Sequence, residues 1–318
     1  MSSRTFLLPF FFSIFLASVS AADGSKRLLD SGQVDQALQT LEQDIRHNPN
    51  DASAHNLLCR AYFMLDEWDR AVASCERAVN LDPQKSLYHL WLGRAYGEKA
   101  DRAGVFSAAG LVKKVRTSFE RAVELDPKSS EARTDLGEFY TEAPGIVGGG
   151  KDKARQQADA LMSFDPARAH WLIARVDEKN KDAAGAEHEY RAAIEASHSE
   201  ARGWLDLANF FFYAHRQEEM ERAIRTLETS PVDHPEALMH AAGILERAGR
   251  DFPTAIRLLR RYLASPVEEG PAFKAHDLLG RLLEKQGDRK GAEEEFRAAL
   301  AMARNYAHAR EDLKRVEH

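Results

Sequence analysis

The stretch Leu81-Asp82-Pro83 recurs as Leu125-Asp126-Pro127 and, slightly changed, as Phe164-Asp165-Pro166, and Asn48-Pro49 occupies the same place one unit earlier. The four prolines are 34, 44 and 39 residues apart. A residue before proline is pushed out of the helical region, and proline lacks the amide donor, so each pair is predicted to end a helix. The spacing therefore indicates a 34-residue period with insertions of ten and five residues.

Small and aromatic residues recur in fixed places within each unit. The first helix has the pattern Leu-Gly-x-x-Tyr, as in Leu92-Gly93-x-x-Tyr96. The second helix has an alanine, a large residue four positions later and another alanine, as in Ala292-x-x-x-Phe296-x-x-Ala299. Small residues let two helices cross closely, and the aromatic ring fills the space beside them. Each helix pair therefore buries one face by itself and offers another to the next pair.

This pattern resembles the tetratricopeptide repeat, and the resemblance covers nearly all of the chain after its N-terminal segment. It implies an all-α fold, a right-handed superhelix of antiparallel helix pairs in one elongated array. Residues 22–306 form the predicted solenoid, with insertions near 103–112 and 143–150, and residues 307–318 form a C-terminal capping helix. About eight units are expected, starting near Ala22, Ala52, Ser86, Ser130, Ala167, Ala201, Glu236 and Phe273.

Composition and charge exclude some classes of protein. The 318 residues are 44% apolar and 30% charged and contain no stretch of alternating Val, Ile and Thr, which argues against an all-β fold. The formal net charge is −6, with 44 Lys and Arg mixed among 50 Asp and Glu, and there is no long basic tract. Nucleic-acid binding depends on such positive charge, so no nucleic acid is expected as a partner.

Residues 1–21 have the features of a secretory signal peptide. A basic Arg4 precedes an apolar run over residues 6–19, and the small residues Ser20-Ala21-Ala22 follow. The run is too short for a comfortable membrane crossing and contains Pro9, so no membrane span is expected after cleavage. The alternative is an uncleaved anchor. The mature protein is predicted to be exported, to the periplasm or as a secreted protein.

Both insertions leave alternatives open. The segment Gly145 to Asp152 matches the spacing of a phosphate-binding loop, except that Asp152 stands where Ser or Thr would ligate magnesium. Its place between two helices of a repeat favours a structural glycine turn over a nucleotide site. The other insertion, near 103–112, is apolar for a helix connection. It either folds back on the edge of the solenoid, which is favoured, or contacts a partner.

The two cysteines, Cys59 and Cys75, take the glycine place of a first helix and the aromatic place of its partner. Antiparallel pairing of the two helices brings these places near each other. In an exported protein this permits a disulfide. Two buried thiols acting as small apolar residues are the alternative, because helix crossing need not satisfy the narrow geometry of the bond.

The resemblance also implies a peptide-binding groove, because in this family the first helices usually line the concave face and ligand peptides lie there. Arginines beside aromatic rings could hold an acidic segment while the rings take its apolar side chains. The alternative is that these arginines pair with Glu138, Glu178 and Asp277 inside the scaffold. The residues expected in the groove are Asn56, Arg60, Phe63, Arg94, Trp171, Arg175, Phe212 and Arg281.

The sequence contains no recognisable catalytic or metal-binding pattern. The 12 histidines are scattered and no Cys-x-x-Cys occurs, so no catalytic residue, metal or cofactor is expected. The resemblance implies a non-catalytic scaffold that binds a protein or peptide partner. Two other functions stay open: an accessory protein that binds nucleotide or phosphate through Gly145 to Asp152, and a structural subunit of an envelope assembly.

Overall fold

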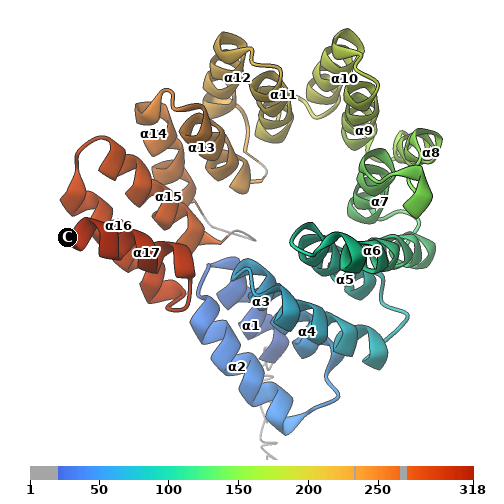
Figure 1. Ribbon diagram of the computed structural model, residues 1–318, viewed down its shortest axis with the longest axis horizontal. Helices are drawn as coiled ribbons and strands as arrows, with labels where there is room; N and C mark the ends of the chain where they lie inside the picture. Colours follow the sequence, from blue (N-terminus) through green and yellow to red (C-terminus); the bar gives the residue numbers. More distant parts are fainter. Residues whose placement is uncertain (1–20, 233, 266–270) are drawn as a thin grey trace, which may run out of the picture.

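The computed structural model describes residues 21–232, 234–265 and 271–318, and within them the chain forms eight antiparallel helix pairs and a terminal helix (Figure 1). The predicted signal peptide lies outside the described residues, apart from Ala21. The expected all-α superhelix of about eight repeats is confirmed. The helices are α1 (Ala21–Asp30), α2 (Val34–His47), α3 (Ala52–Met64), α4 (Trp68–Leu81), α5 (Ser86–Asp101), α6 (Val105–Leu125), α7 (Ser130–Glu142), α8 (Lys151–Leu161), α9 (Pro166–Lys179), α10 (Ala183–Ala196), α11 (Ala201–Tyr213), α12 (Gln217–Thr229), α13 (Glu236–Ala248), α14 (Phe252–Ala264), α15 (Ala272–Lys285), α16 (Arg289–Met302) and α17 (Ala307–Glu317), with a 3-10 turn η1 (Gly145–Val147).

The glycines of the first helices allow the two helices of a pair to cross closely. A Cβ atom on Gly93 would lie 2.4 Å from the Phe119 ring, and one on Gly280 would lie 2.5 Å from the Phe296 ring. A side chain at either glycine would displace the ring that fills the crossing. The recurring pairing of glycine with an aromatic residue is therefore a packing requirement of the helix pair.

The Asp-Pro pairs mark repeat boundaries in two different ways. Asp82 and Asp126 each follow the last residue of a second helix, as predicted. Asp165 differs, because α8 has already ended at Leu161 and the Asp165 side chain accepts a hydrogen bond from the Arg168 amide at 3.0 Å. Asp165 is thus the N-cap of α9, and Pro166 occupies the first turn, where its missing amide donor costs nothing.

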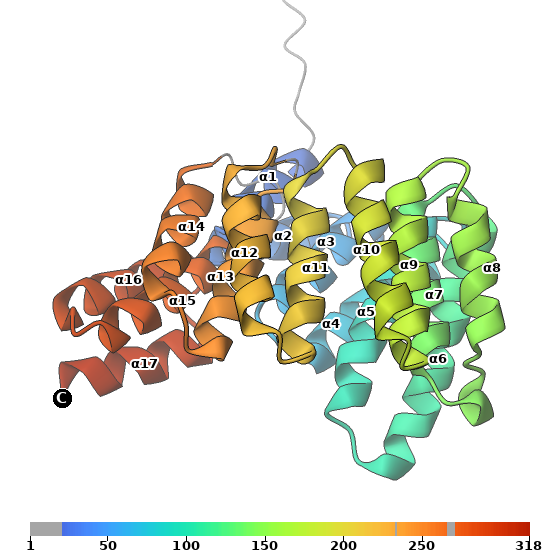
Figure 2. The same cartoon turned by 90° about the horizontal axis from the view of Figure 1, so that it is seen from above.

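The ten-residue insertion lengthens a helix pair. Figure 2 shows the α5–α6 pair reaching beyond its neighbours, and α6 is 21 residues long. Leu111 packs against the apolar cluster of the neighbouring helices, whereas Ala109 and Gly110 are exposed. The side chains of residues 105–107 lie outside the described residues. The segment therefore projects from the array and does not fold back along its edge.

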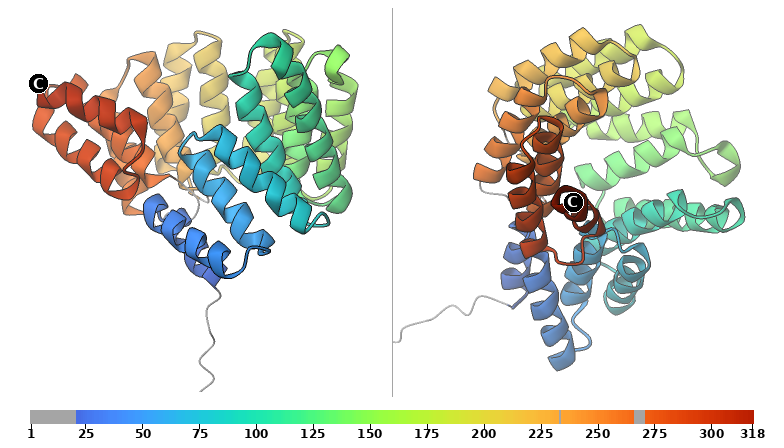
Figure 3. Two further views of the ribbon diagram at one scale, coloured as in Figure 1. Left: turned by 60° about the horizontal axis from the view of Figure 1, so that its bottom comes forward. Right: turned by 60° about the vertical axis from the view of Figure 1, so that its left-hand side comes forward.

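The two ends of the array meet, so the elongated array expected from the sequence is wrong. Figures 1 and 3 show α1–α3 beside α15–α17. Lys274 on α15 donates a hydrogen bond to Asp66 at 2.8 Å, and the Arg304 guanidinium, just after α16, donates to Asp35 on α2 at 2.9 Å. We call this contact the seam.

A shared apolar cluster explains why the seam closes. Phe273, Ala299, Tyr306 and Ala309 from the C-terminal end belong to the same buried cluster as residues of α1, α2 and α3. Both ends of an open solenoid would leave apolar surface in water, and at the seam they bury that surface against each other. The terminal helix α17 packs on α15 and α16, and its Ala309 belongs to the shared cluster. Within the described residues, no helix has both the length and the apolar content needed to cross a membrane.

Candidate functional site

The inner side of the ring is hollowed between successive first helices. Four hollows have volumes of about 270, 600, 400 and 410 Å³. They share lining residues: Asp206 lines three of them, and Asp135 and Glu138 line two each. The hollows therefore form one continuous surface across α5, α7, α9, α11, α13 and α15, which we call the lumen.

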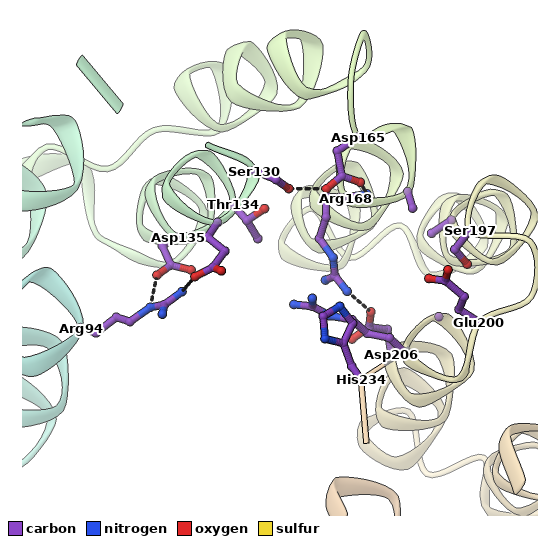
Figure 4. A pocket seen from close by; sticks show the side chains of 15 residues that line it. Arg94, Ser130, Thr134, Asp135, Asp165, Arg168, Ser197, Glu200, Asp206 and His234 are labelled. Atoms are coloured by element: carbon purple, nitrogen blue, oxygen red, sulfur yellow. Dashed lines mark hydrogen bonds and ion pairs between the residues drawn. The ribbon is translucent and has the colours of Figure 1, made fainter. Parts of the chain in front are cut away.

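Arg94 joins neighbouring repeats across the lumen. Its guanidinium donates to Asp135 at 2.6 Å (Figure 4). It also donates to Glu131 at 2.9 Å, so that α5 is tied to α7. The guanidinium carbon also lies 5.0 Å from the centroid of the Trp91 ring. The scaffold thus supplies two charge-assisted hydrogen bonds to this arginine.

Arg175 makes the same kind of bridge one repeat further along. Its guanidinium lies 3.1 Å from Glu142, 3.4 Å from Glu178 and 3.7 Å from Glu138, which ties α9 to α7. One arginine therefore faces three carboxylates. Lys179 adds a second link to Glu142 at 2.8 Å.

The remaining two groove arginines are paired as well. Arg281 on α15 donates to Asp277 at 2.8 Å and lies 4.0 Å from Glu246 on α13. Arg60 is only 5% exposed and lies 4.0 Å from Asp30. Pairing inside the scaffold, the alternative that the sequence left open, is therefore what the structure shows for the groove arginines. They set the positions of neighbouring repeats and leave little for an acidic ligand to bind.

Five of the eight predicted groove residues line the lumen, but they are spread over its four hollows. Arg94 lines two of the hollows, Trp171 and Arg175 share a third, and Arg281 and Phe63 each line one hollow. The other three predicted residues line none of the four hollows: Asn56, Arg60 and Phe212.

Aromatic and amide side chains among these residues are mostly engaged in packing. Phe63 makes edge-on contacts with Trp68 and Trp91, with ring centroids 5.2 and 5.5 Å apart. Phe212 has the Arg247 guanidinium 5.3 Å from its ring centroid. Asn56 is 2% exposed, and within the described residues its side-chain nitrogen has no hydrogen-bond partner.

Sequence reasoning missed Arg202 and Tyr213 as lumen residues. Along α11, Arg202, Asp206 and Asn209 are followed by Tyr213 at spacings of four, three and four, which places all of them on one helix face. Thr134 on α7 also lines a hollow.

Burial and crowding of carboxylates raise several acid pKa values in the lumen. Loss of hydration raises the pKa of Asp135, Glu138 and Asp206 above the usual range, against the attraction of nearby arginines. The acids lining the four hollows outnumber Lys and Arg by twelve to seven. The lining is therefore acidic, in contrast to the basic groove that the sequence suggested.

Asp277 gives the clearest pH dependence. It is 1% exposed, and burial raises its pKa to about 6 despite the attraction of Arg281, with Asp312 adding repulsion. Between pH 4 and 6 the folded state holds a proton that the unfolded state has lost. The free energy of unfolding therefore falls as the pH rises through this window, by about 3 kcal/mol at pH 7.

We expect Asp277→Asn to relieve this penalty. The advantage of the variant over the wild type should be near zero at pH 4 and grow to about 3 kcal/mol at pH 7, because the amide cannot ionise but can still accept from Arg281. Urea unfolding at several pH values measures the difference. Asp159→Asn, at an exposed position of α8, is the matched control. A difference for Asp277→Asn that does not change with pH would contradict this account.

The glycine loop does not have the form of a phosphate cradle. It follows α7, where a nucleotide loop follows a strand, and the amide groups of Gly148, Gly149 and Gly150 already donate to backbone carbonyls. A Cβ atom on Gly149 would lie 1.8 Å from the Ala143 carbonyl oxygen, which explains a glycine there. Lys151 donates to the Asn180 side chain at 2.5 Å. The three glycine amides and the Lys151 side chain are therefore engaged within the protein.

The cysteine pair occupies the crossing of the second repeat. Cys59 and Cys75 are joined in a disulfide, with Cα atoms 5.2 Å apart, at the places that Gly93 and Phe119 take in the next repeat. Among the described residues, no group of three or more His, Cys, Asp and Glu side chains could hold a metal ion.

Comparisons with known proteins agree with this architecture. Two models of the tetratricopeptide repeat family match the chain, over residues 28–94 and 240–307. The crystal structure of yeast Tom70 aligns with 98% of this chain and 66% of that chain, with a TM-score of 0.55 and 15% identity. TTC0263 of Thermus thermophilus, described as a thermophilic TPR protein, aligns with 60% of this chain and 97% of that chain, with a TM-score of 0.50 and 18% identity. At these identities the likeness shows the fold.

One similarity to a curated protein is local. Cellulose synthase operon protein C of Escherichia coli K12 is 38% identical over 63 residues, which are 20% of this chain and 5% of that protein. The corresponding putative protein of Escherichia coli O157:H7 matches over the same length, 6% of its chain. The matched segment thus spans a small part of these relatives.

Proposed function

Because the chain is a tetratricopeptide repeat protein, we propose that it is a non-catalytic scaffold that binds a segment of another protein in the lumen of its ring. The observation that carries this proposal is the continuous surface formed by four adjoining hollows. Such a surface offers charged, polar and aromatic groups over several repeats, which suits an extended segment more than a single small molecule.

We also propose that the protein works outside the cytosol, in the periplasm or as a secreted protein. The features of residues 1–21 support this location. The Cys59–Cys75 disulfide supports it independently, because such bonds persist in oxidising compartments.

Site-specific photo-cross-linking tests the lumen as the binding surface. A benzophenone amino acid replaces Asn209, which lines two hollows, or Arg222, an exposed residue of the outer helix α12. We expect irradiation in the producing cells to give a cross-linked partner from position 209 and none from position 222. Peptide mapping then identifies the partner segment. Cross-links of equal yield at both positions, or from position 222 alone, would count against the lumen.

A further inference from the structure

One hollow of the lumen combines aromatic rings with carboxylates. Its volume is about 400 Å³, and Trp171 on α9 and Tyr213 at the end of α11 line it together with three carboxylates and one arginine: Glu138, Glu178, Asp206 and Arg175. Tyr213 is 62% exposed, the largest exposed fraction of an aromatic side chain among the described residues. An exposed ring beside carboxylates is the combination that attracts a cation, through the face of the ring and through charge.

Glu138 is the carboxylate of this hollow with the weakest contact to a positive group. Glu138 has Arg175 at 3.7 Å, beyond hydrogen-bond distance, and that arginine is shared with Glu142 and Glu178. The pKa of Glu138 is raised by burial and by neighbouring acids, as expected of a carboxylate with too little compensating charge. An incoming cation would relieve this crowding.

The next hollow offers a polar group without a partner. Thr134 on α7 is 7% exposed, and within the described residues its hydroxyl oxygen has no hydrogen-bond partner. It lines the hollow of Figure 4, which meets the aromatic hollow at Asp206. A buried hydroxyl without a partner is costly, so a ligand group that reaches it gains a hydrogen bond.

We infer that the lumen binds a basic segment, with a lysine or arginine side chain seated between Glu138, Trp171 and Tyr213, and that the segment continues past Thr134. This inference rests on the proposed function and specifies the partner. An acidic segment, the partner that the arginines suggested, would be repelled by the excess of carboxylates that line the lumen. A basic segment would be attracted by the aromatic face, by Glu138 and by the acidic lining on both sides.

Fluorescence polarisation with two labelled peptides tests the inference. The probes are acetyl-(Ala-Lys)5 and acetyl-(Ala-Glu)5, titrated with the full chain at 150 mM salt. We expect the lysine peptide to bind and the glutamate peptide not to bind. Glu138→Gln and Tyr213→Leu should each weaken binding of the lysine peptide about tenfold, while Tyr213→Phe, which keeps the aromatic face, should stay within about twofold.

Matched controls separate the site from general attraction to an acidic protein. Glu294→Gln removes an exposed charge on the outer helix α16, and Phe164→Ala removes an exposed ring between α8 and α9; both should leave the dissociation constant unchanged. Equal binding of the two peptides, or unchanged binding by Glu138→Gln and Tyr213→Leu, overturns the cation site. If position 209 still cross-links a partner in that case, the lumen proposal survives without the basic segment. If it does not, both proposals fall.

Discussion

Replacing Phe273 with alanine is expected to lower the free energy of unfolding by about 3–5 kcal/mol and to loosen the seam. Phe273 is fully buried, and its ring lies 4.9 Å from that of Tyr306 in an edge-on contact. It belongs to the apolar cluster that joins both ends of the ring. Removing the ring leaves a cavity in this shared cluster. Urea unfolding measures the loss, and cross-linking across the seam measures the opening.

Phe296→Ala is the matched control for that change. Phe296 is also fully buried, but it packs against Gly280 inside the α15–α16 pair and belongs to a different cluster. We expect a similar loss of stability with the seam retained. If both variants keep the seam to the same degree, Phe273 does not hold the two ends together.

Breaking the Cys59–Cys75 bond should lower the free energy of unfolding by about 3 kcal/mol. The two residues are 16 apart in sequence, and a loop of this size gives that magnitude in the chain-entropy model. The expected result is a lower urea midpoint in the presence of reductant. Identical midpoints with and without reductant, or alkylation of both thiols before reduction, would contradict it.

The neighbouring repeats supply a control for this bond. The double variant Cys59→Gly and Cys75→Phe restores the pairing of glycine with an aromatic ring seen at Gly93 and Phe119. Its urea midpoint should not respond to reductant. A response in this variant would mean that the reductant acts elsewhere.

Most of the architecture could be predicted from the sequence, because the repeat pattern depends on contacts within one helix pair. The pairing of Gly93 with Phe119 recurs within one helix pair, so a 34-residue pattern is enough to reveal it. The role of the Asp165-Pro166 pair was predicted less accurately. Asp165 caps the following helix, and an Asp-Pro pair alone does not tell a helix end from a helix start.

The charge of the lumen could not be predicted in the same way. The partners of Arg94 are 37 and 41 residues away on the next first helix, at positions that the repeat pattern leaves variable. Arginines alone suggested an acidic ligand. The positions of Asp135 and Glu131 reverse that interpretation, because both accept hydrogen bonds from the Arg94 guanidinium. The acids that line the hollows also outnumber the Lys and Arg residues there.

The repeat pattern does not predict that the ring closes. It depends on the small rotation that each of eight helix pairs adds, and on contacts such as that between Lys274 and Asp66, which are 208 residues apart. Apolar residues at both ends were visible in the sequence. That they cover each other follows only from the summed curvature of the array.

The most direct test of the closed ring is zero-length cross-linking of the purified monomer with a carbodiimide. The reagent joins an amine to a carboxylate already in contact, and the Lys274 nitrogen lies 2.8 Å from an Asp66 oxygen. Lys179 and Glu142, also 2.8 Å apart but on neighbouring first helices, provide the internal control. A closed ring predicts both cross-links within one chain. Formation of the Lys179–Glu142 link without the Lys274–Asp66 link in the monomer would contradict it.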